Sequence, residues 1–354
     1  MAGGAGRARI EAAMPAHDQK RVLTGITTTG TPHLGNYVGA IRPALAEGGE
    51  RVGDPYYFLA DYHALVGCFE PQRVVRSTLE IAATWLALGL DTERAVFYRQ
   101  SDVPEVAELA WLLSCVTAKG LMNRAHAYKS AAAANQAAGA DPDHGVSMGL
   151  FNYPVLMAAD ILLFNASRVP VGRDQVQHLE MAREIAGRFN NRYGAHFVLP
   201  EAIVCDDIPT LPGNDGRKMS KSYDNTIPLW LPADLLRKAI MRIRTDSRAP
   251  GEPKDPDTST VYQIYAAFAG PAQRESMRRA FVDGIAWSDA KEALFELVNS
   301  ELAEPRERYW QLVDDSAAVE IALAEGAGKA RASAAPFMAE LRRAVGIRPL
   351  YAAR

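Results

Sequence analysis

The spacing of apolar and polar positions changes repeatedly along the first half of this chain. Short apolar runs, typical of buried strands, alternate with longer stretches in which apolar residues recur every three or four positions, as on one face of a helix. The predicted strands are residues 21–26, 55–60 and 95–98. The predicted helices are residues 35–45, 73–88 and 104–118. This alternation predicts an α/β fold with a Rossmann-like, doubly wound parallel sheet.

The pattern continues less regularly beyond residue 118. The expected elements are a mobile loop or frayed helix over 130–143, an apolar helix over 153–164 and a short buried strand over 168–171. Asp102 and Asp174 are each placed to cap the helix that follows, and Gly172 provides a turn after the third of these elements. Residues 206–225 are rich in Pro, Gly and Asp, which is typical of a long surface loop.

After Pro232 no further strand is predicted. Helical spacing is found over residues 235–243, 260–268, 275–282 and 290–312, and a last amphipathic helix covers 335–345. The expected division is a flexible tail over 1–19, a catalytic domain over 20–225, an all-helical domain over 226–335 and a C-terminal helix over 336–354 that packs back. The length of 354 residues fits about two domains.

Composition narrows the functional classes only slightly. With 39 Lys and Arg against 42 Asp and Glu, the net charge of −3 neither demands nor excludes a polyanionic partner. The three cysteines form no CxxC pair, so we expect no thiolate metal site, and their sparse number fits a reducing compartment. No apolar run approaches the roughly 18 residues of a membrane span, and the N-terminus lacks a signal-peptide core. We therefore expect a cytoplasmic protein without membrane association.

The first candidate site joins the first strand to the first helix and reads TTTGTPHLGN (27–36). In open α/β sheets, ligands bind at the carboxyl ends of the strands. Gly30 and Gly35 let a ligand approach the backbone. His33 and Asn36 lie three residues apart on one helical face, where both can donate hydrogen bonds to phosphate oxygens beside the helix N-terminus. The alternative is an ordinary strand-to-helix turn with His33 on the surface.

The second candidate site is the string KMSKS at residues 218–222, within the Pro- and Gly-rich loop. Lys218 and Lys221 flank hydroxyl groups on a segment expected to be mobile. Two ammonium groups there suit the neutralisation of a polyphosphate that must later leave. The alternative is a solvated basic loop.

Together the two segments resemble the two signatures of class I aminoacyl-tRNA synthetases. KMSKS matches its signature in full, and HLGN (33–36) matches the other with Asn in place of the second His. Further stretches resemble the tryptophanyl-tRNA synthetases. They are HLGNYVGAIRP (33–43), YPVLMAADILLF (153–164) and VPVGRDQVQHLEMAREIAGRFNNRYG (169–194). The tyrosyl enzymes, the nearest relatives within class I, have a different first signature.

The resemblance assigns a specific role to Asp160. Indole has one N–H donor and no acceptor, so a selective pocket needs one buried acceptor in an apolar wall. A carboxylate within the apolar helix at 153–164 is costly unless it is paired. By resemblance, Asp160 accepts the indole N–H, and a phenylalanine side chain would leave it unpaired. The alternative is that Asp160 pairs with an arginine for structural reasons.

The resemblance also implies the other site residues. Catalytic roles fall to His33, Asn36, Lys218 and Lys221. The implied ATP contacts are Thr27, Thr28, Thr29, Gly35, Asn36, Gly172, Arg173, Asp174, Ile208, Lys218, Met219, Ser220, Lys221 and Ser222. The implied tryptophan contacts are Tyr153, Met157, Asp160, Val171 and Gln175. Lys129 falls where the family has a mobile lysine near the phosphates, and His178 is interpreted as structural.

The sequence departs from the family at its first turn. The family usually has Gly-Ile-Gln-Pro-Thr/Ser-Gly, whereas this chain has GITTTG over residues 25–30. Thr27 replaces a longer amide and cannot span the same distance to a substrate. A water molecule or Lys129 would have to substitute for it.

The implied reaction activates L-tryptophan with ATP and transfers it to tRNA(Trp). Mg²⁺ is expected as part of the bound ATP, with no protein-bound metal cofactor, because no ligand cluster exists. Family resemblance also implies a homodimer. The basic run formed by Arg237, Lys238, Arg242 and Arg244 is expected on one helix, as a phosphate contact or a solvated face. The alternatives are a tyrosyl-tRNA synthetase-like enzyme, a small-molecule nucleotidyl transferase and a non-catalytic paralogue.

Overall fold

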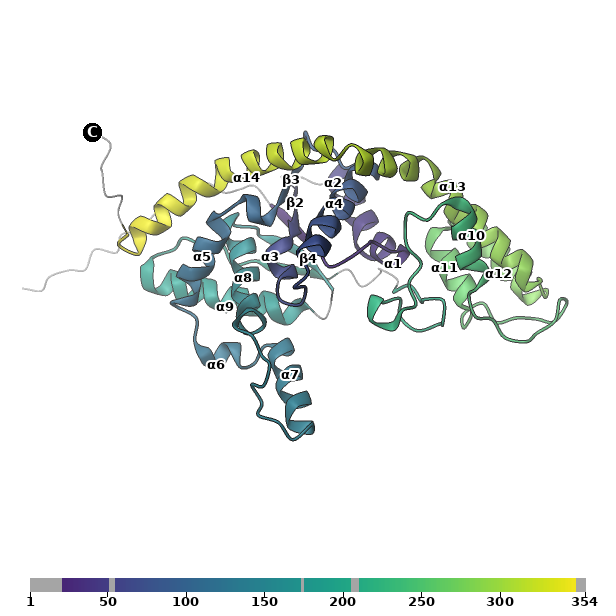
Figure 1. The fold of residues 1–354 in the computed structure, drawn as a ribbon, viewed down its shortest axis with the longest axis horizontal. Helices are drawn as coiled ribbons and strands as arrows, with labels where there is room; N and C mark the ends of the chain where they lie inside the picture. The colour runs from purple at the N-terminus through teal and green to yellow at the C-terminus, as the bar shows by residue number, and fades with distance from the viewer. Residues whose placement is uncertain (1–20, 51–54, 173–174, 205–209, 348–354) are drawn as a thin grey trace, which may run out of the picture.

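The computed structural model describes residues 21–50, 55–172, 175–204 and 210–347, and its centre is a parallel sheet (Figure 1). Its strands are β1 (Val22–Thr27), β2 (Pro55–Ala60), β3 (Val96–Arg99), β4 (Arg168–Val171) and β5 (Glu201–Val204). They are ordered β3-β2-β1-β4-β5, and neighbouring strands are parallel. The predicted doubly wound sheet is confirmed, although β5 was missed. Between β1 and β4 the strand order reverses, so a crevice is expected at their carboxyl ends.

Helices cover both faces of the sheet because the strand side chains alternate between two cores. On β2, Tyr57 and Leu59 belong to one core, while Tyr56 and Phe58 belong to the other. The first core is closed by α2 (Arg42–Glu50), α4 (Pro71–Ala87) and helices from the C-terminal part. The second is closed by α5 (Glu105–Ser114), α8 (Met148–Leu163) and α9 (Val176–Tyr193).

One local prediction is wrong, and a second is made more specific. Asp102 caps no helix: α5 begins after Pro104, and the Asp102 carboxylate instead accepts a hydrogen bond from Arg99 Nε at 3.0 Å. Residues 130–143 begin within a regular helix, α7 (His126–Ala137), and only their second part is a loop. No side chain of α7 is buried, and Figure 1 shows it projecting from the body together with α6 (Lys119–Met122). Alanine has a high helix propensity, but its small side chain gives α7 no large apolar face to bury.

Beyond residue 232 the described residues form helices and no strand. The first four are α10 (Ala233–Met241), α11 (Thr260–Phe268), α12 (Pro271–Val282) and α13 (Trp287–Asp314). These helices share the first core with the sheet: the Trp230 ring stacks on Tyr309 of α13, with centroids 4.8 Å apart, and its Nε1 donates to Thr84 Oγ1 of α4. The helical part is therefore anchored to the α/β part through α4.

The basic run near α10 does not lie on one helix. Arg237 and Lys238 belong to α10 and pair with Glu292 and Asp234, respectively. The helix ends at Met241, so the other two arginines of the run follow it. The expectation of a single basic helix face is therefore wrong.

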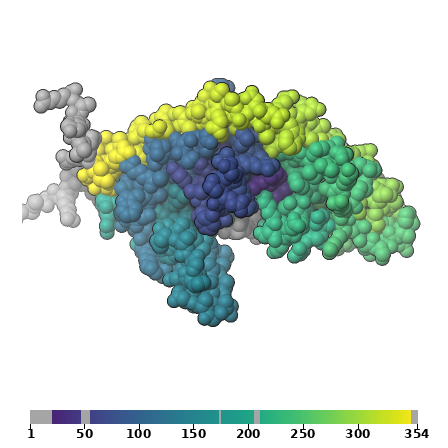
Figure 2. Space-filling view, in the orientation of Figure 1, coloured from purple at the N-terminus to yellow at the C-terminus, as the bar shows by residue number. Residues whose placement is uncertain are grey.

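The last helix, α14 (Ser316–Ala344), runs back along β3 at the edge of the sheet, where the space-filling view shows it covering the upper margin of the molecule (Figures 1 and 2). It is continuous through residues 335 and 336, where the sequence had suggested a boundary. A Cβ at Gly326 would lie 1.7 Å from the Phe97 carbonyl oxygen, so only glycine permits this approach. Lys329 Nζ donates to the Thr92 carbonyl at 2.6 Å. Covering an edge strand in this way removes a template for unwanted strand pairing.

The great length of α13 and α14 does not make them membrane helices. Within the described ranges, no helix combines the length and the apolar character that crossing a membrane requires.

Candidate active site

The turn after β1, residues 28–33 and called here the β1 turn, ends at His33. His33 is the N-cap of α1 (Leu34–Asn36), with an extended backbone at φ −127° and ψ 169°. Its N–H donates to Asn36 Oδ1 at 3.1 Å. The two residues are therefore neighbours, but His33 precedes the helix rather than sharing its first turn as predicted. Because the Asn36 oxygen is used locally, the amide nitrogen is the end that can donate to a ligand.

Burial controls the charge of His33. The residue is 7% exposed, and its Nδ1 has no hydrogen-bond partner in the described part of the chain. Desolvation, with the nearby positive charge of Lys221, lowers the pKa of His33 to about 4. The imidazole is therefore neutral at pH 7 in the ligand-free protein. A Cβ at Gly35 would lie 3.0 Å from its ring, so a larger residue there would require the imidazole to shift.

The second signature lies beside the first. Lys221 Nζ is 3.0 Å from the position that a Cβ on Gly30 would occupy, and Gly30 has the left-handed φ of +142°. Met219 packs next to Gly35. Burial and the charge of Arg73 lower the pKa of Lys221, whereas the nearby Glu80 carboxylate raises it. The structure thus brings together the two predicted segments and presents a cation at the carboxyl end of β1.

Backbone hydrogen bonds fix this juxtaposition. Leu34 N–H donates to the Ile227 carbonyl, and Leu229 N–H donates to the Pro32 carbonyl, each at 3.0 Å. Residues 227–229 therefore pair with the end of the β1 turn. In the KMSKS segment, Ser220 N–H donates to Oδ1 of the buried Asn225 at 2.8 Å. Lys218 and Lys221 are both exposed residues of this segment.

Asp160 is the central group of a second site, on α8. It is 1% exposed, and its two carboxylate oxygens are 2.7 Å from Gln100 Nε2 and 2.9 Å from His63 Nε2. Desolvation raises the pKa of Asp160, and the hydrogen bonds from His63 and Gln100 oppose that rise. Within the described residues its side-chain partners are His63 and Gln100, and no arginine pairs with it. A carboxylate has about four acceptor positions, so this one can accept a further hydrogen bond.

His63 and Gln100 were not identified from the sequence. His63 lies on α3 (Asp61–Ala64), directly after β2, and Gln100 opens a 3₁₀ turn (Gln100–Asp102) directly after β3. Adjacent parallel strands end at the same edge of a sheet, so polar residues following two neighbouring strands were the available signal. What the sequence could not show is that both reach a carboxylate on α8.

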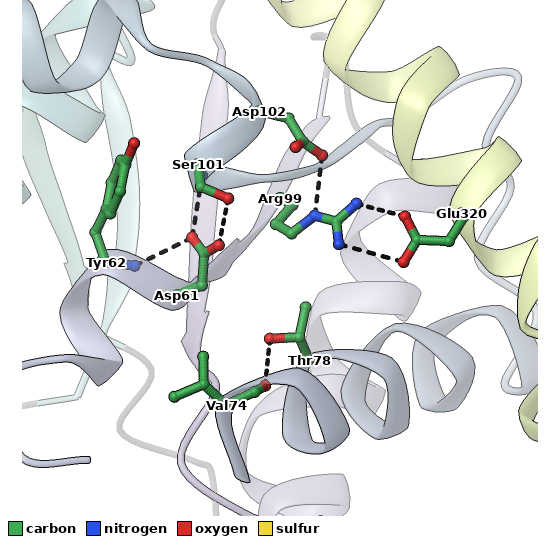
Figure 3. A network of polar contacts seen from close by, with 8 residues as sticks. All are labelled: Asp61, Tyr62, Val74, Thr78, Arg99, Ser101, Asp102 and Glu320. Carbon is green, nitrogen blue, oxygen red and sulfur yellow. Dashed lines mark hydrogen bonds and ion pairs between the residues drawn. The ribbon is translucent and has the colours of Figure 1, made fainter. Parts of the chain in front are cut away.

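A polar network locks these two turns together (Figure 3). The Asp61 carboxylate accepts hydrogen bonds from the N–H groups of Tyr62 and Ser101, at 3.1 and 3.0 Å, and from the Ser101 hydroxyl. Gln100 Oε1 accepts from Tyr62 N–H at 3.1 Å. Because α3 and the Gln100 turn are fixed to each other, the partners of Asp160 are held in place before any ligand arrives.

Two of the other expected tryptophan contacts, Tyr153 and Gln175, are connected to each other through His178. Tyr153 Oη is 2.5 Å from His178 Nε2, and His178 Nδ1 is 3.0 Å from Gln175 Oε1. The Tyr153 ring also meets the His63 ring edge-on, with centroids 6.4 Å apart. His178 is thus a buried link between two predicted site residues. Met157 and Val171 are half-buried against the second core.

The structure describes only some of the remaining predicted site residues, and their surroundings differ. Thr27 is exposed at the end of β1, whereas Thr28 is fully buried and its hydroxyl has no partner in the part of the chain that the structure describes. Gly172 follows β4 and accepts from Gln175 N–H. Lys129 is exposed on α7, and no hydrogen bond or ion pair of the described chain joins it to the β1 turn. The predicted ATP contacts outside the described residues are Arg173, Asp174 and Ile208.

Comparison with known proteins decides the family. The model described as tRNA synthetases class I (W and Y) matches residues 15–303. A tryptophan–tRNA ligase of Pseudomonas aeruginosa is 62% identical over 333 residues, covering 93% of this chain and 74% of the relative. The chain belongs to the class I tryptophanyl-tRNA synthetase family. Another member, from Neisseria meningitidis, is 56% identical and aligns over 94% of this chain and 99% of its own length.

Solved structures of tryptophanyl-tRNA synthetases agree. The Campylobacter jejuni synthetase complexed with ADP and tryptophan superimposes with a TM-score of 0.84 at 40% identity, covering 92% of this chain and 99% of the other. The tyrosyl-tRNA synthetase of Archaeoglobus fulgidus, at 20% identity and a TM-score of 0.60, shares the fold.

Within the described residues, no group of three or more His, Cys, Asp or Glu side chains could hold a metal ion.

Proposed function

We propose that this chain activates L-tryptophan with ATP, giving tryptophanyl-adenylate and pyrophosphate, and then transfers the tryptophanyl group to tRNA(Trp). The observation that carries the proposal is Asp160, a buried carboxylate held by His63 and Gln100 with acceptor capacity left for a further donor. An indole N–H satisfies that requirement. A phenol hydroxyl could donate as well, and the 62% identity with a tryptophan–tRNA ligase favours tryptophan over tyrosine.

The first step needs no protein nucleophile. A tryptophan carboxylate oxygen attacks the α-phosphorus of ATP while the bond to the bridging oxygen breaks and pyrophosphate leaves. Catalysis then consists of positioning and charge stabilisation. In this proposal Lys221 and Lys218 stabilise the departing pyrophosphate, and neutral His33 and the Asn36 amide nitrogen donate to phosphate oxygens. Mg²⁺ enters bound to ATP as part of the substrate.

The proposed ATP contacts extend around both signatures. They comprise Thr27, Thr28, Thr29, Gly35, Gly172, Met219, Ser220 and Ser222, with Arg173, Asp174 and Ile208 beyond the described residues. The proposed tryptophan pocket adds Tyr153, Met157, Val171 and Gln175 around Asp160. The proximity of Lys221 to Gly30 supports a single nucleotide site that includes both signatures.

The assembly and the division of the chain are also proposals. We infer an α/β catalytic part up to about residue 225 and a helical part that binds the tRNA anticodon arm. A homodimer in the cytoplasm accords with the family. The exposed Trp111 on α5, at 70% exposure, offers apolar surface for a second copy. Light scattering on the purified chain tests the dimer, which a monomeric mass would contradict.

Amino-acid-dependent exchange of pyrophosphate into ATP tests the activity. The purified chain is assayed with Mg²⁺ and each of the twenty amino acids in turn. Exchange with tryptophan alone is expected. Exchange with tyrosine would instead identify a tyrosyl enzyme, and exchange with none would identify a non-catalytic paralogue. Charging of tRNA(Trp) transcripts then tests the second step.

A further inference from the structure

One face of α4 contacts three consecutive residues of the chain after β1. Residues 73, 77 and 80 lie on that face because four- and three-residue steps keep helical side chains aligned. The contacts are Arg73 Nη2 to the Thr29 carbonyl at 3.3 Å, Gly30 N–H to Ser77 Oγ at 2.5 Å and Thr31 Oγ1 to Glu80 Oε2 at 2.8 Å. The helix therefore supports the β1 turn one residue after another.

The turn is held from two sides. The Gly30 amide points to Ser77 of α4, while the position of its absent Cβ faces Lys221 Nζ. Glu80 is 6% exposed, and its second carboxylate oxygen accepts from Arg76 Nε at 2.7 Å. Both oxygens of this buried carboxylate are engaged, so the Thr31 hydroxyl has a fixed acceptor. Lys221 and α4 thus enclose the Gly30 backbone.

We propose that Ser77 and Glu80 are positioning residues for the nucleotide, because they hold Gly30 and Thr31 in the conformation that receives ATP. The inference rests on the proposed function, in which the β1 turn binds the phosphates. A turn that is ordered beforehand does not lose its conformational freedom when ATP binds. Neither residue touches the nucleotide in this proposal. Ser77 acts through the Gly30 amide and Glu80 through the Thr31 hydroxyl, and the Glu80 charge also raises the pKa of Lys221.

The test compares variants of α4 in pyrophosphate exchange. The variants are Ser77→Ala, Glu80→Ala, Glu80→Gln and Thr31→Val, together with the double variant Thr31→Val/Glu80→Ala. The matched control is Thr78→Val, which removes the neighbouring hydroxyl of the same helix. Thr78 Oγ1 donates at 2.8 Å to the Val74 carbonyl within α4 (Figure 3), so this hydrogen bond does not involve the β1 turn. Thermal unfolding of every variant identifies those that are merely less stable.

The expected result separates the KM for ATP from the KM for tryptophan. Ser77→Ala and Glu80→Ala should raise KM for ATP by about 5–20-fold, with KM for tryptophan changed less than about two-fold. Glu80→Gln should retain more ATP affinity than Glu80→Ala, because its one amide oxygen can still accept from Thr31, although its NH2 group cannot accept from Arg76 Nε. The double variant should have a KM for ATP no higher than that of Glu80→Ala alone, because both substitutions remove the same hydrogen bond between Thr31 and Glu80.

Three results would overturn the proposal. They are an unchanged KM for ATP in Ser77→Ala and Glu80→Ala, an equal loss in Thr78→Val, or an additive double variant. Calorimetric binding of a non-hydrolysable ATP analogue repeats the comparison without turnover. Wild-type protein that binds the analogue but catalyses no exchange would refute the proposed function alone. Variants that bind it as tightly as wild type would refute the positioning role alone.

Discussion

The two halves of the site differ in how completely their polar groups are paired. Around Asp160, both carboxylate oxygens have partners, and the turns that carry those partners are bonded to each other. Around the β1 turn, His33 Nδ1 and the Thr28 hydroxyl are buried with no partner among the described residues, and Lys218 is exposed. The amino-acid site is set by side-chain pairs, whereas the nucleotide site keeps polar atoms uncommitted.

This difference follows from what each ligand requires. A pocket that distinguishes indole from other rings needs one acceptor in a fixed position, so its surroundings must be rigid. A triphosphate brings many acceptors and must leave as pyrophosphate, so donors that become satisfied only with the ligand are suitable. The α4 contacts show that the backbone of the β1 turn is nevertheless held.

The largest effect is expected from Asp160→Ala. It removes the acceptor for the indole N–H and leaves His63 and Gln100 without their partner, so kcat/KM for tryptophan should fall about 10³-fold. KM for ATP should stay within about three-fold, because the two sites share no residue here. Steady-state exchange kinetics measure both. Asp234→Asn, at an exposed carboxylate of α10, is the control. If the variant discriminates against phenylalanine as strongly as wild type does, Asp160 does not determine tryptophan selectivity.

Lys221→Ala should lower the rate constant of adenylate formation and leave tryptophan affinity nearly unchanged. Loss of a cation that acts on developing charge is expected to slow adenylate formation about 10²-fold, with little change in KM for tryptophan. Rapid-quench measurement of adenylate formation provides the rate constant. Lys238→Ala, at an exposed ion pair, serves as the matched control. An effect confined to KM for ATP would mean that Lys221 binds the ground state and transition state equally.

The buried neutral His33 predicts an acid-sensitive fold. Its pKa is lowered to about 4, below the ordinary value of 6.5, so between these values the unfolded chain binds a proton that the native chain does not. The free energy of unfolding should therefore fall as pH decreases from 6.5 to 4, by up to about 3 kcal/mol. Urea unfolding across this range measures it.

His33→Gln provides the comparison for that titration. The variant should lose this part of the pH dependence, and its difference from wild type should be constant between pH 7.5 and 9, where His33 is neutral in both states. Equal slopes for the two proteins between pH 4 and 6.5 would contradict the assignment.

The smallest effect is expected at the contact between α14 and the amino-acid half. Arg99 is shared between Asp102 of the Gln100 turn and Glu320 of α14 (Figure 3). The pair with Glu320 is partly exposed, so Glu320→Ala should cost no more than about 1 kcal/mol of stability. KM for tryptophan should rise less than about two-fold, since Asp102 still holds Arg99. A larger rise would mean that α14 positions the pocket directly.

Local periodicity was sufficient to predict much of the fold. Strands 55–60 and 168–171 and helix 260–268 have the bounds that the sequence predicted. Strand β5 was missed because its four residues are intermediate or exposed and show no apolar alternation. Helix α14 was recognised only at its end, because Ala, Gly and Ser dominate its first half. Those small residues include Gly326, which the approach to β3 requires.

The sequence by itself determined the chemistry of the two signatures, the buried carboxylate at Asp160 and the change from an α/β part to a helical part, because these depend on residue type and short-range spacing. Only the tertiary structure decided that His63 and Gln100 hold that carboxylate and that α4 supports the β1 turn. These partners are distant in sequence, and their contacts depend on how parallel strands and helices pack. No local pattern encodes that arrangement, since each contact forms only after the sheet has assembled.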